Sequence, residues 1–225
     1  MTEVILDTET TGLSIDKDRV VEIACIELQN HFPTKNIFHR YINPDNTKVT
    51  PGAFETHGYT DQFLSTKPKF KEIVGEFLNY IKDKKLIIHN ADFDIGILNN
   101  ELRRLNLPSI KKEQVIDTLN IAREKFPGST SNNLNALCKK FKIDVSEREK
   151  HSALLDCQLL AKVYIELIGE RELSLNLNSS PDIQLNKNQT IKSSGIVINI
   201  TDEQKEEYIK FLKKNVTNAF ALEKK

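Results

Sequence analysis

The sequence of 225 residues has no tryptophan, one methionine, three cysteines and no apolar run long enough to cross a membrane. A membrane-spanning helix needs roughly 18 consecutive apolar residues, so no membrane span is expected. The N-terminus already reads as a strand, which argues against a signal peptide. Cys25, Cys138 and Cys157 are odd in number and lack the spacing of metal ligands. We therefore expect buried thiols and a reducing compartment.

The chain also lacks a net charge, because 32 basic residues balance 32 acidic ones. This balance does not indicate a strong general nucleic-acid binder. It is compatible with an enzyme that grips a few terminal nucleotides and gains positive charge from bound metal ions. Such an enzyme would depend on a partner to hold a duplex.

The stretch V-I-L-D-T-E-T-T-G-L places two carboxylates directly after a short apolar run. Val4, Ile5 and Leu6 predict a buried strand, and residues two apart on a strand point to the same side. Asp7 and Glu9 would therefore repel each other and lose hydration unless a cation lies between them. Oxygen ligands of this kind suit Mg²⁺ or Mn²⁺ better than zinc. A strand that simply ends in a polar turn is the alternative.

A further acidic residue falls on a helix face that should be buried. Apolar residues recur at helical spacing in a series that contains one carboxylate: Ala153, Asp156, Leu160, Val163 and Leu167. Acidic side chains are almost never fully buried unless paired, so Asp156 needs a partner, and a metal ion is a good candidate. His151 lies at or just before the first turn of this helix, close enough to share a site with Asp156. A purely structural role is the alternative for this histidine.

The motif H-N-A-D-F-D has a similar layout. Leu86, Ile87 and Ile88 predict a short strand, and apolar residues after position 94 predict a helix. Asp94 falls at the junction between them, where functional groups are commonly placed.

Periodicity along the chain predicts an α/β domain followed by a segment of different character. We expect strands near 3–8, 20–28, 36–42 and 86–89, and helices near 68–82, 94–106, 117–125, 131–141 and 151–169. Asn132 or Ser131 would cap the fourth of these helices. Residues 174–195 are rich in Ser and Asn and contain no aromatic residue, which predicts a flexible linker. The linker would join a folded domain at 1–173 to a tail at 196–225.

The motifs D-x-E, H-N-A-D-F-D and H-x-x-x-x-D together resemble the three exonuclease motifs of the DEDDh superfamily of 3′→5′ exonucleases. The resemblance is closest to the epsilon (proofreading) subunits of bacterial DNA polymerase III. It includes F-E-T-H-G-Y-T-D at 54–61, K-P-K-F at 67–70 and N-N-L-N-A-L-C-K-K-F-K-I-D at 132–144. It covers about residues 1–170, with one small departure at Ser152, where a glycine is common. It implies a ribonuclease H-like fold, a mixed sheet flanked by helices.

The resemblance implies a catalytic set and two cofactors, which would be Mg²⁺ or Mn²⁺ ions. Asp7 would bridge both ions, Glu9 and Asp156 would complete one metal site, and Asp94 would support the other, directly or through water. His151 would take the proton from the attacking water, because an ordinary imidazole pKa of about 6.5 suits a base at neutral pH. The substrate would be a single-stranded or frayed DNA 3′ end, released as deoxynucleoside 5′-monophosphates.

The resemblance also implies a substrate-binding set that includes Asp7, Glu9 and Asp156. Phe93 would wedge against the terminal bases, and His57 would contact the end nucleotides. A place in the hydrophobic core is an equally good interpretation of Phe93.

The tail after residue 195 combines V-I-N-I with T-D-E-Q and an apolar helical face made by Ile209, Leu212, Val216, Ala219 and Phe220. Thr201 or Asp202 is a natural N-cap. About 25 residues are too few to fold alone, so this face requires a partner surface or packs back on its own domain.

By resemblance, the tail's partner is the polymerase III alpha subunit. The stretch R-E-L-S-L-N-L at 171–177 lacks the Gln of a sliding-clamp motif, so clamp contact is doubtful. The sequence leaves open whether a small third core subunit binds the domain.

Two functional classes fit this organisation: a catalytic proofreading exonuclease and a non-catalytic accessory subunit that only stabilises a polymerase. All five motif residues are intact, which favours the enzyme. Within the enzyme class, an RNA-directed or repair exonuclease of the same superfamily is the alternative, and only the tail separates the two. We expect a proofreading DNA exonuclease of the bacterial cytoplasm, in the nucleoid-associated replisome.

Overall fold

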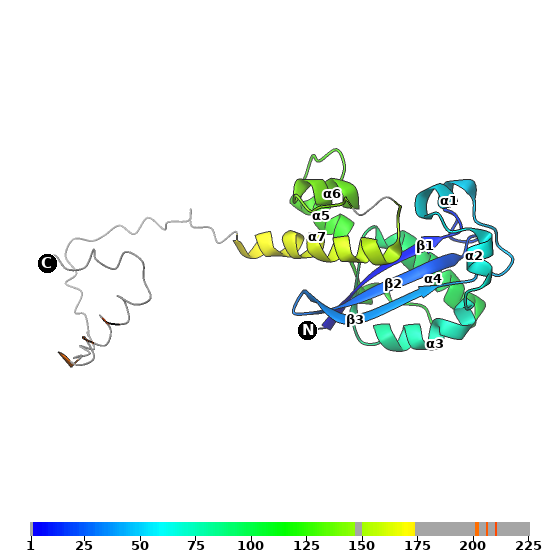
Figure 1. The fold of residues 1–225 in the computed structure, drawn as a ribbon, viewed down its shortest axis with the longest axis horizontal. Coiled ribbons are helices and arrows are strands. Elements are labelled where there is room, and N and C mark those ends of the chain that lie inside the picture. Colours follow the sequence, from blue (N-terminus) through cyan, green and yellow to red (C-terminus); the bar gives the residue numbers. More distant parts are fainter. Residues whose placement is uncertain (1, 147–149, 174–200, 203–205, 207–209, 211–225) are drawn as a thin grey trace. The chain divides into compact units, whose positions relative to one another are not determined.

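The computed structural model describes residues 2–146 and 150–173, and beyond them residues 201, 202, 206 and 210. The chain divides into two units, Met1–Leu177 and Asn178–Lys225, and the fold described below belongs to the first (Figure 1). Apart from those four positions, the predicted linker and tail lie outside the described residues. Within the described part of the chain, no helix combines the length and apolarity needed to span a membrane.

A five-stranded mixed sheet forms the centre of the first unit, in the order β3-β2-β1-β4-β5. Its strands are β1 (Thr2–Thr10), β2 (Val20–Gln29), β3 (Phe32–Tyr41), β4 (Lys85–Ile88) and β5 (Val115–Asp117). The β1–β2 and β2–β3 pairs are antiparallel, whereas β1–β4 and β4–β5 are parallel. The predicted α/β architecture with a mixed sheet is therefore confirmed.

Strand β1 lies at the centre of the sheet and is buried on both faces, which explains its continuous apolar run. Val4 and Leu6 belong to one core and Ile5 to the other, because successive side chains alternate between the faces. Helices α3 (Phe70–Ile81) and α4 (Ala91–Arg104) pack in the first core. Helices α5 (Thr118–Lys125), α6 (Leu134–Lys140) and α7 (Ala153–Leu173) pack in the second (Figure 1).

Several short elements were not predicted, because they are too short to show a period. They are α1 (Pro51–His57), α2 (Asp61–Ser65), the 3₁₀ helix η1 (Lys112–Gln114) and strand β5. Threonines provide a local signal for the first two: the side chains of Thr50 and Thr60 accept hydrogen bonds from the first turns of α1 and α2.

Two predicted helix starts were wrong. Helix α4 begins at Ala91, after Asn90 takes a left-handed conformation with φ of 66°, so Asp94 lies in the first turn and not at the junction. Helix α6 is capped by Asn133, whose Oδ1 accepts from the backbone N–H of Ala136 at 2.8 Å. A cap must lie about three residues before the N–H that it satisfies, and Asn133 takes this place instead of the predicted Asn132 or Ser131.

Helix α7 begins at Ala153 and ends at Leu173, later at both ends than the predicted 151–169. His151 therefore lies just before the helix, within the range expected for it. The three cysteines are buried and free, as expected. The sulfur of Cys157 lies 3.3 Å from the carbonyl oxygen of Ala24, which shows how closely α7 packs on the sheet.

Candidate active site

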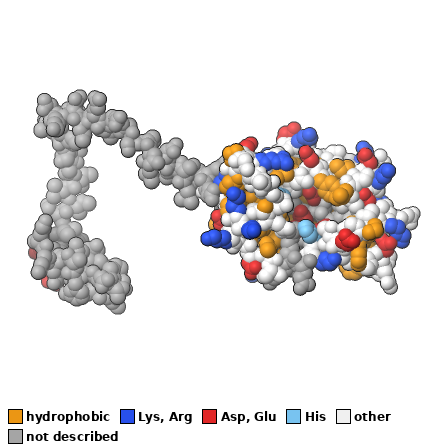
Figure 2. Space-filling model, turned by 90° about the horizontal axis from the view of Figure 1, so that it is seen from above, with side chains coloured by type: hydrophobic (Ala, Val, Ile, Leu, Met, Phe, Trp, Pro, Cys, Tyr) orange, Lys and Arg blue, Asp and Glu red, His pale blue; other side chains and the backbone are white. Residues whose placement is uncertain are grey.

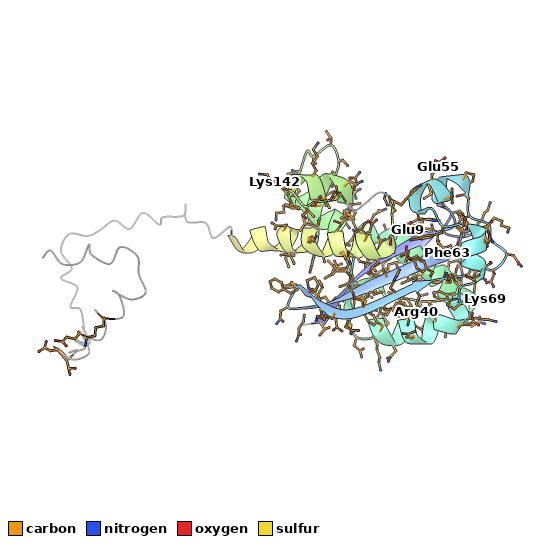
Figure 3. All side chains as sticks on the ribbon, viewed as in Figure 1. Glu9, Arg40, Glu55, Phe63, Lys69 and Lys142 are labelled. Carbon is orange, nitrogen blue, oxygen red and sulfur yellow. The ribbon has the colours of Figure 1, made fainter. Side chains whose placement is uncertain are left out.

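The sequence-predicted site residues gather at one edge of the sheet. Strands β1, β4 and β5 run parallel, so their carboxyl ends meet at that edge. Asp7 and Glu9 come from the end of β1, and Asp94 follows β4 in the first turn of α4. The start of α7 adds Asp156. Figure 3 shows Glu9 beside the N-terminal end of α7.

Within the described part of the chain, Glu9, His151 and Asp156 form a group that could hold a metal ion. Each of these side chains offers one potential metal-ligand atom, and all three atoms lie within 4.8 Å of one another. Nδ1 of His151 lies 3.3 Å from Oδ2 of Asp156, and the His151 side chain is 43% exposed while Asp156 is buried. Asp7, His151 and Asp156 also line one cavity of about 690 Å³. Figure 2 shows histidine and acidic side chains close together on one face of the molecule.

Asp94 reaches the site from the opposite face of the sheet. Alternation along β1 places Asp7 and Glu9 on the side of α7, and Thr8 on the side of α4. Thr8 donates two hydrogen bonds to Oδ1 of Asp94, from its backbone N at 3.1 Å and from its hydroxyl at 2.7 Å. The residue between the two β1 carboxylates thus holds the Asp94 carboxylate against the end of the strand.

Burial and nearby carboxylates raise the pKa of two acidic residues of this site, Asp7 and Asp94. Burial raises the pKa of Asp7 well above its ordinary range, and the charges of Asp94, Asp156, Glu9 and Glu22 raise it further. Burial also raises the pKa of Asp94 to about 7, although its hydrogen bonds from Thr8 act in the opposite direction. Carboxylates that are buried together and repel each other are a donor set that fits hard divalent cations.

A second cavity, of about 280 Å³, is lined in part by Glu9. Its lining includes Thr10, Gly12, Leu13, His57 and Phe93. Phe93 is half-buried, and it is absent from the described side chains that pack on either core. The two residues expected to contact the end of the substrate therefore share a cavity that Glu9 also lines.

Both ring nitrogens of His57 are engaged by the protein. The backbone N–H of Tyr59 donates to Nδ1 at 3.0 Å, so Nε2 carries the proton and donates to the carbonyl of Thr10 at 3.2 Å. Burial lowers the pKa of His57, which keeps the ring neutral. A contact of this ring with a nucleotide would therefore use its carbon edge or face, and one face stacks on Tyr59.

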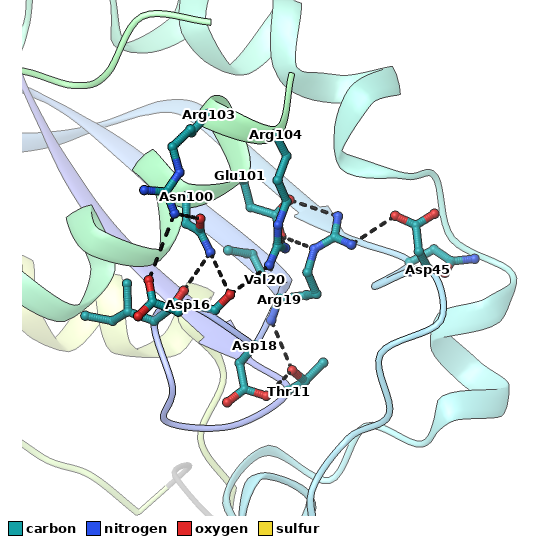
Figure 4. A network of polar contacts seen from close by, with 12 residues as sticks. Thr11, Asp16, Asp18, Arg19, Val20, Asp45, Asn100, Glu101, Arg103 and Arg104 are labelled. Carbon is teal, nitrogen blue, oxygen red and sulfur yellow. Dashed lines mark hydrogen bonds and ion pairs between the residues drawn. The ribbon is translucent and has the colours of Figure 1, made fainter. Parts of the chain in front are cut away.

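A polar network fixes the turn that forms the wall of this second cavity (Figure 4). Nε and Nη2 of Arg19 bind the two oxygens of the buried Glu101 on α4 at 2.5 and 2.9 Å, and Arg19 also pairs with Asp45 at 3.1 Å. At Gly12, a Cβ atom would lie 2.7 Å from the Asp18 carboxylate, so any other residue would displace this carboxylate from its hydrogen bonds with Thr11 and Ser14. The turn leaves Leu13 90% exposed at the cavity.

Three residues at the site were missed in the sequence, although each carries a local signal. Leu13 is an apolar residue inside a polar turn. Thr8 stands between two carboxylates on a predicted strand. Glu22 interrupts the apolar run V-V-E-I-A-C-I on β2, and the reasoning that found Asp156 on an apolar stripe applies to it equally.

Comparison with known proteins agrees with this geometry. The chain matches the family model described as Exonuclease over residues 4–164. It is 42% identical to the DNA polymerase III subunit epsilon of Rickettsia conorii, over 97% of this chain and 98% of that protein. It is 40% identical to the subunit of the same name from Buchnera aphidicola subsp. Baizongia pistaciae, over 99% of this chain and 97% of the relative.

Solved structures share the fold. Exonuclease X in complex with 5′ overhanging duplex DNA superposes with a TM-score of 0.60 and 27% identity, over 75% of this chain and 92% of that chain. The nuclease domain of 3′hExo, a DEDDh family member bound to rAMP, superposes with a TM-score of 0.64 over the same shares of both chains. Its identity is 19%, which shows the fold alone.

A mixed sheet whose parallel strands end in mutually repelling carboxylates beside a histidine defines a divalent-metal-dependent exonuclease domain. The family match and the near full-length relatives agree with this class. The chain belongs to the exonuclease family and, within it, to the epsilon subunits of DNA polymerase III. The resemblance in the motifs is therefore confirmed.

Proposed function

We propose that this proofreading 3′→5′ exonuclease removes mispaired 3′-terminal nucleotides of DNA as 5′-monophosphates. In this proposal Asp7, Glu9, Asp94 and Asp156 hold two Mg²⁺ or Mn²⁺ ions and His151 is the general base. The observation that carries it is the grouping of Glu9, His151 and Asp156 within 4.8 Å. Asp7 lines a cavity with His151 and Asp156, and burial, together with the surrounding carboxylates, raises its pKa.

The chain's own residues would bind the ions, orient water and move a proton. When bound, the ions supply Lewis-acid chemistry, which activates water and stabilises charge on the leaving 3′ oxygen. The charges of Asp94 and Asp156 both act on the pKa of Asp7, so its carboxylate would be the one suited to contact both ions. His151 directs Nδ1 toward Asp156 at 3.3 Å, so Nε2 is the nitrogen that would accept the proton of the attacking water.

The cavity beside Glu9 would take the terminal nucleoside. Phe93 and the exposed Leu13 provide apolar surface for a base, while His57 supports the wall through its bonds to Thr10 and Tyr59. The scissile phosphate would then face Glu9 and the neighbouring carboxylates. The apolar surfaces of Phe93 and Leu13 would not distinguish one base from another, so selectivity would come from how easily the end of the DNA separates.

This proposal predicts a clear order of substrates. Single-stranded and 3′-mismatched DNA should be shortened faster than fully paired DNA, because unpairing costs a few kcal/mol less at a mispaired end. The measurement is single-nucleotide shortening of 5′-labelled strands under single-turnover conditions, with identification of the released 5′-monophosphate. RNA of the same sequence is the comparator. Equal rates on paired and unpaired DNA ends would contradict the fraying mechanism, and faster cleavage of RNA would favour the RNA-directed alternative.

We also propose an exonuclease domain at 1–173, a linker at 174–195 and a tail at 196–225 that binds the polymerase III alpha subunit in the cytoplasm. The similarity to epsilon subunits supports this, since the Rickettsia conorii match spans 97% of this chain and so extends past the exonuclease motifs. The sequence of the tail supports it too, because an apolar helical face follows a polar stretch. A linker of about 22 flexible residues has an r.m.s. span of about 25 Å and would keep the nuclease at about millimolar local concentration.

Replacing Leu212 and Phe220 together with Asp should abolish co-purification with the alpha subunit and leave activity on single-stranded DNA unchanged. The matched control replaces Thr217 and Asn218 with Asp, which adds the same charge away from the apolar face. The control should still co-purify. Normal binding by the Leu212/Phe220 variant, or loss of catalysis on truncation after residue 175, would show that the tail belongs to the nuclease domain.

A further inference from the structure

Glu22 is a fully buried carboxylate next to the proposed site. It lies on β2 opposite Glu9 in the antiparallel β1–β2 ladder and has 0% of its surface exposed. A charged side chain in such a place must be compensated. The hydrogen-bond donors that compensate this buried charge connect Glu22 to other parts of the site.

Four donors from three segments of the chain converge on this carboxylate. Oε1 accepts hydrogen bonds from Nε2 of His39 at 2.7 Å and from the hydroxyl of Ser152 at 3.1 Å. Oε2 accepts from the hydroxyl of Tyr59 at 2.8 Å and from the backbone N–H of Ala153 at 3.0 Å. A carboxylate has about four acceptor positions, so all of them are used. These hydrogen bonds outweigh the effect of burial and lower the pKa of Glu22.

Two of these donors belong to the segment that carries His151 and Asp156. Ser152 and Ala153 directly follow His151, and the carbonyl of Ser152 accepts the N–H of Asp156 at 2.9 Å. The N–H of Ala153 is one of the first in α7, where the helix has no internal acceptor and favours a negative charge. Ser152 is also the position where the sequence departs from the common glycine of the motif, and its hydroxyl supplies one of the four bonds.

A third donor, the hydroxyl of Tyr59, connects Glu22 to the second cavity. The ring of Tyr59 stacks on His57 with centroids 4.7 Å apart and an interplanar angle of 23°. His57 in turn bonds to Thr10 and lines the cavity with Phe93. The Glu22 carboxylate therefore fastens both the start of α7 and the wall of the second cavity to the central sheet.

We infer that Glu22 is a positioning residue: its buried carboxylate fastens the start of α7 to the sheet and so sets His151 and Asp156 against Glu9. This rests on the proposed roles of His151 and Asp156. Glu22 is not a catalytic residue, because its oxygens are all occupied by protein donors. It acts through the geometry of the loop that ends at Ala153.

Glu3 provides a matched control within the same sheet. It is a buried carboxylate on β1, 2% exposed, and it accepts hydrogen bonds from Nδ1 of His31 at 2.7 Å and the hydroxyl of Tyr164 at 3.1 Å. Tyr164 lies on α7, so Glu3 also joins the sheet to this helix, but at the strand's other end. Its loss should affect stability and leave the catalytic geometry in place.

The test compares Glu22→Gln with Glu3→Gln in the full chain, using kcat and KM on single-stranded DNA with Mn²⁺ and the melting temperature. The amide that replaces the Glu22 carboxylate brings N–H groups among four donors, so at least one hydrogen bond is lost. We expect kcat to fall about 10–100-fold in Glu22→Gln, as for partners that orient ligands, with KM nearly unchanged. Glu3→Gln should keep the kcat of the unaltered protein. Equal kcat in the two variants would overturn the inference.

A double substitution tests whether Glu22 acts through His151. If it does, Glu22→Gln should lose most of its effect on kcat when His151 is already alanine, since coupled residues are not additive. The same fold-loss in both backgrounds, with no change in the Mn²⁺ concentration needed for half-maximal rate, would overturn a positioning role, because Glu22 would then act through neither His151 nor Asp156. If His151→Ala itself keeps full activity, the proposed function of His151 fails independently of Glu22.

Milder variants keep the test decisive if Glu22→Gln does not fold. Tyr59→Phe and Ser152→Ala each remove one donor to Glu22 and leave its charge in place. Each should lower kcat by a smaller factor than Glu22→Gln, with the melting temperature close to that of the unaltered protein. Unchanged kcat in both would count against the positioning role of Glu22.

Discussion

Asp7→Ala is expected to lower turnover on single-stranded DNA by several orders of magnitude while the domain remains folded. Asp7 is the carboxylate whose charge interacts with Asp94, Asp156 and Glu9, so its removal takes away the group proposed to contact both ions. Excess EDTA should abolish the activity of the unaltered protein for the same reason. The measurement is kcat over a range of Mn²⁺ concentrations. Full activity in EDTA, or an unimpaired Asp7→Ala protein, would contradict the two-metal proposal.

Melting temperatures measured without metal distinguish a loss of turnover caused by missing metal ions from one caused by unfolding. Burial and neighbouring charges raise the folded-state pKa of Asp7 above its unfolded value of about 3.9, so its stabilising contribution is complete only below that pH. It is lost as the pH rises through the folded pKa, and the same holds for Asp94, whose folded pKa is about 7. The metal-free protein should therefore melt at a lower temperature at pH 8 than at pH 5.

Asp7→Asn tests whether the charge of Asp7 destabilises the metal-free protein. Without metal at pH 8 this variant should melt at a higher temperature than the unaltered protein, because Asn has nearly the same shape as Asp but carries no charge. Added Mn²⁺ should stabilise the unaltered protein strongly and the variant much less. A lower melting temperature for Asp7→Asn would mean that replacing this carboxylate damages the fold, and loss of activity at this position could then not be assigned to the metal ions.

One signal in the sequence that located site residues is an acidic side chain where the periodicity requires an apolar one. This signal located Asp7 on a core strand and Asp156 on the buried stripe of α7. It also marks Glu22, which no motif singled out. The sheet was predictable for a related reason: β1, β2 and β4 have long or continuous apolar runs, whereas β5 has three residues and depends on pairing with β4.

The features of the site that the sequence did not predict depend on contacts between residues far apart in the chain. Asp94 is held by Thr8, which is 86 positions away, and Glu22 is bound by Ser152, which is 130 positions away. Local periodicity contains no information about such pairs. The position of Asp94 was misjudged for a local reason, since Asn90 ends the turn in a left-handed conformation and lets α4 begin earlier.

His151→Ala is expected to lower kcat about 10²–10⁴-fold, the usual contribution of a general base. In the unaltered protein the rate should rise with pH through an apparent pKa in the range of about 6–8 and then level off, because only neutral imidazole accepts a proton. The variant should lose this rise. His31→Ala is the matched control: this histidine pairs with Glu3, away from the proposed site, and its replacement should leave the pH profile unchanged.

The same variant separates two roles that the geometry allows for His151. Its ring nitrogen belongs to the group of potential ligand atoms with Glu9 and Asp156, so imidazole could bind a metal ion instead of moving a proton. A general base should leave the Mn²⁺ concentration for half-maximal rate nearly unchanged when it is removed. A ligand should raise that concentration, and tight zinc binding through His151 would also show that it is a ligand. We expect the first result, because the carboxylates already provide the oxygen donors that Mg²⁺ and Mn²⁺ prefer.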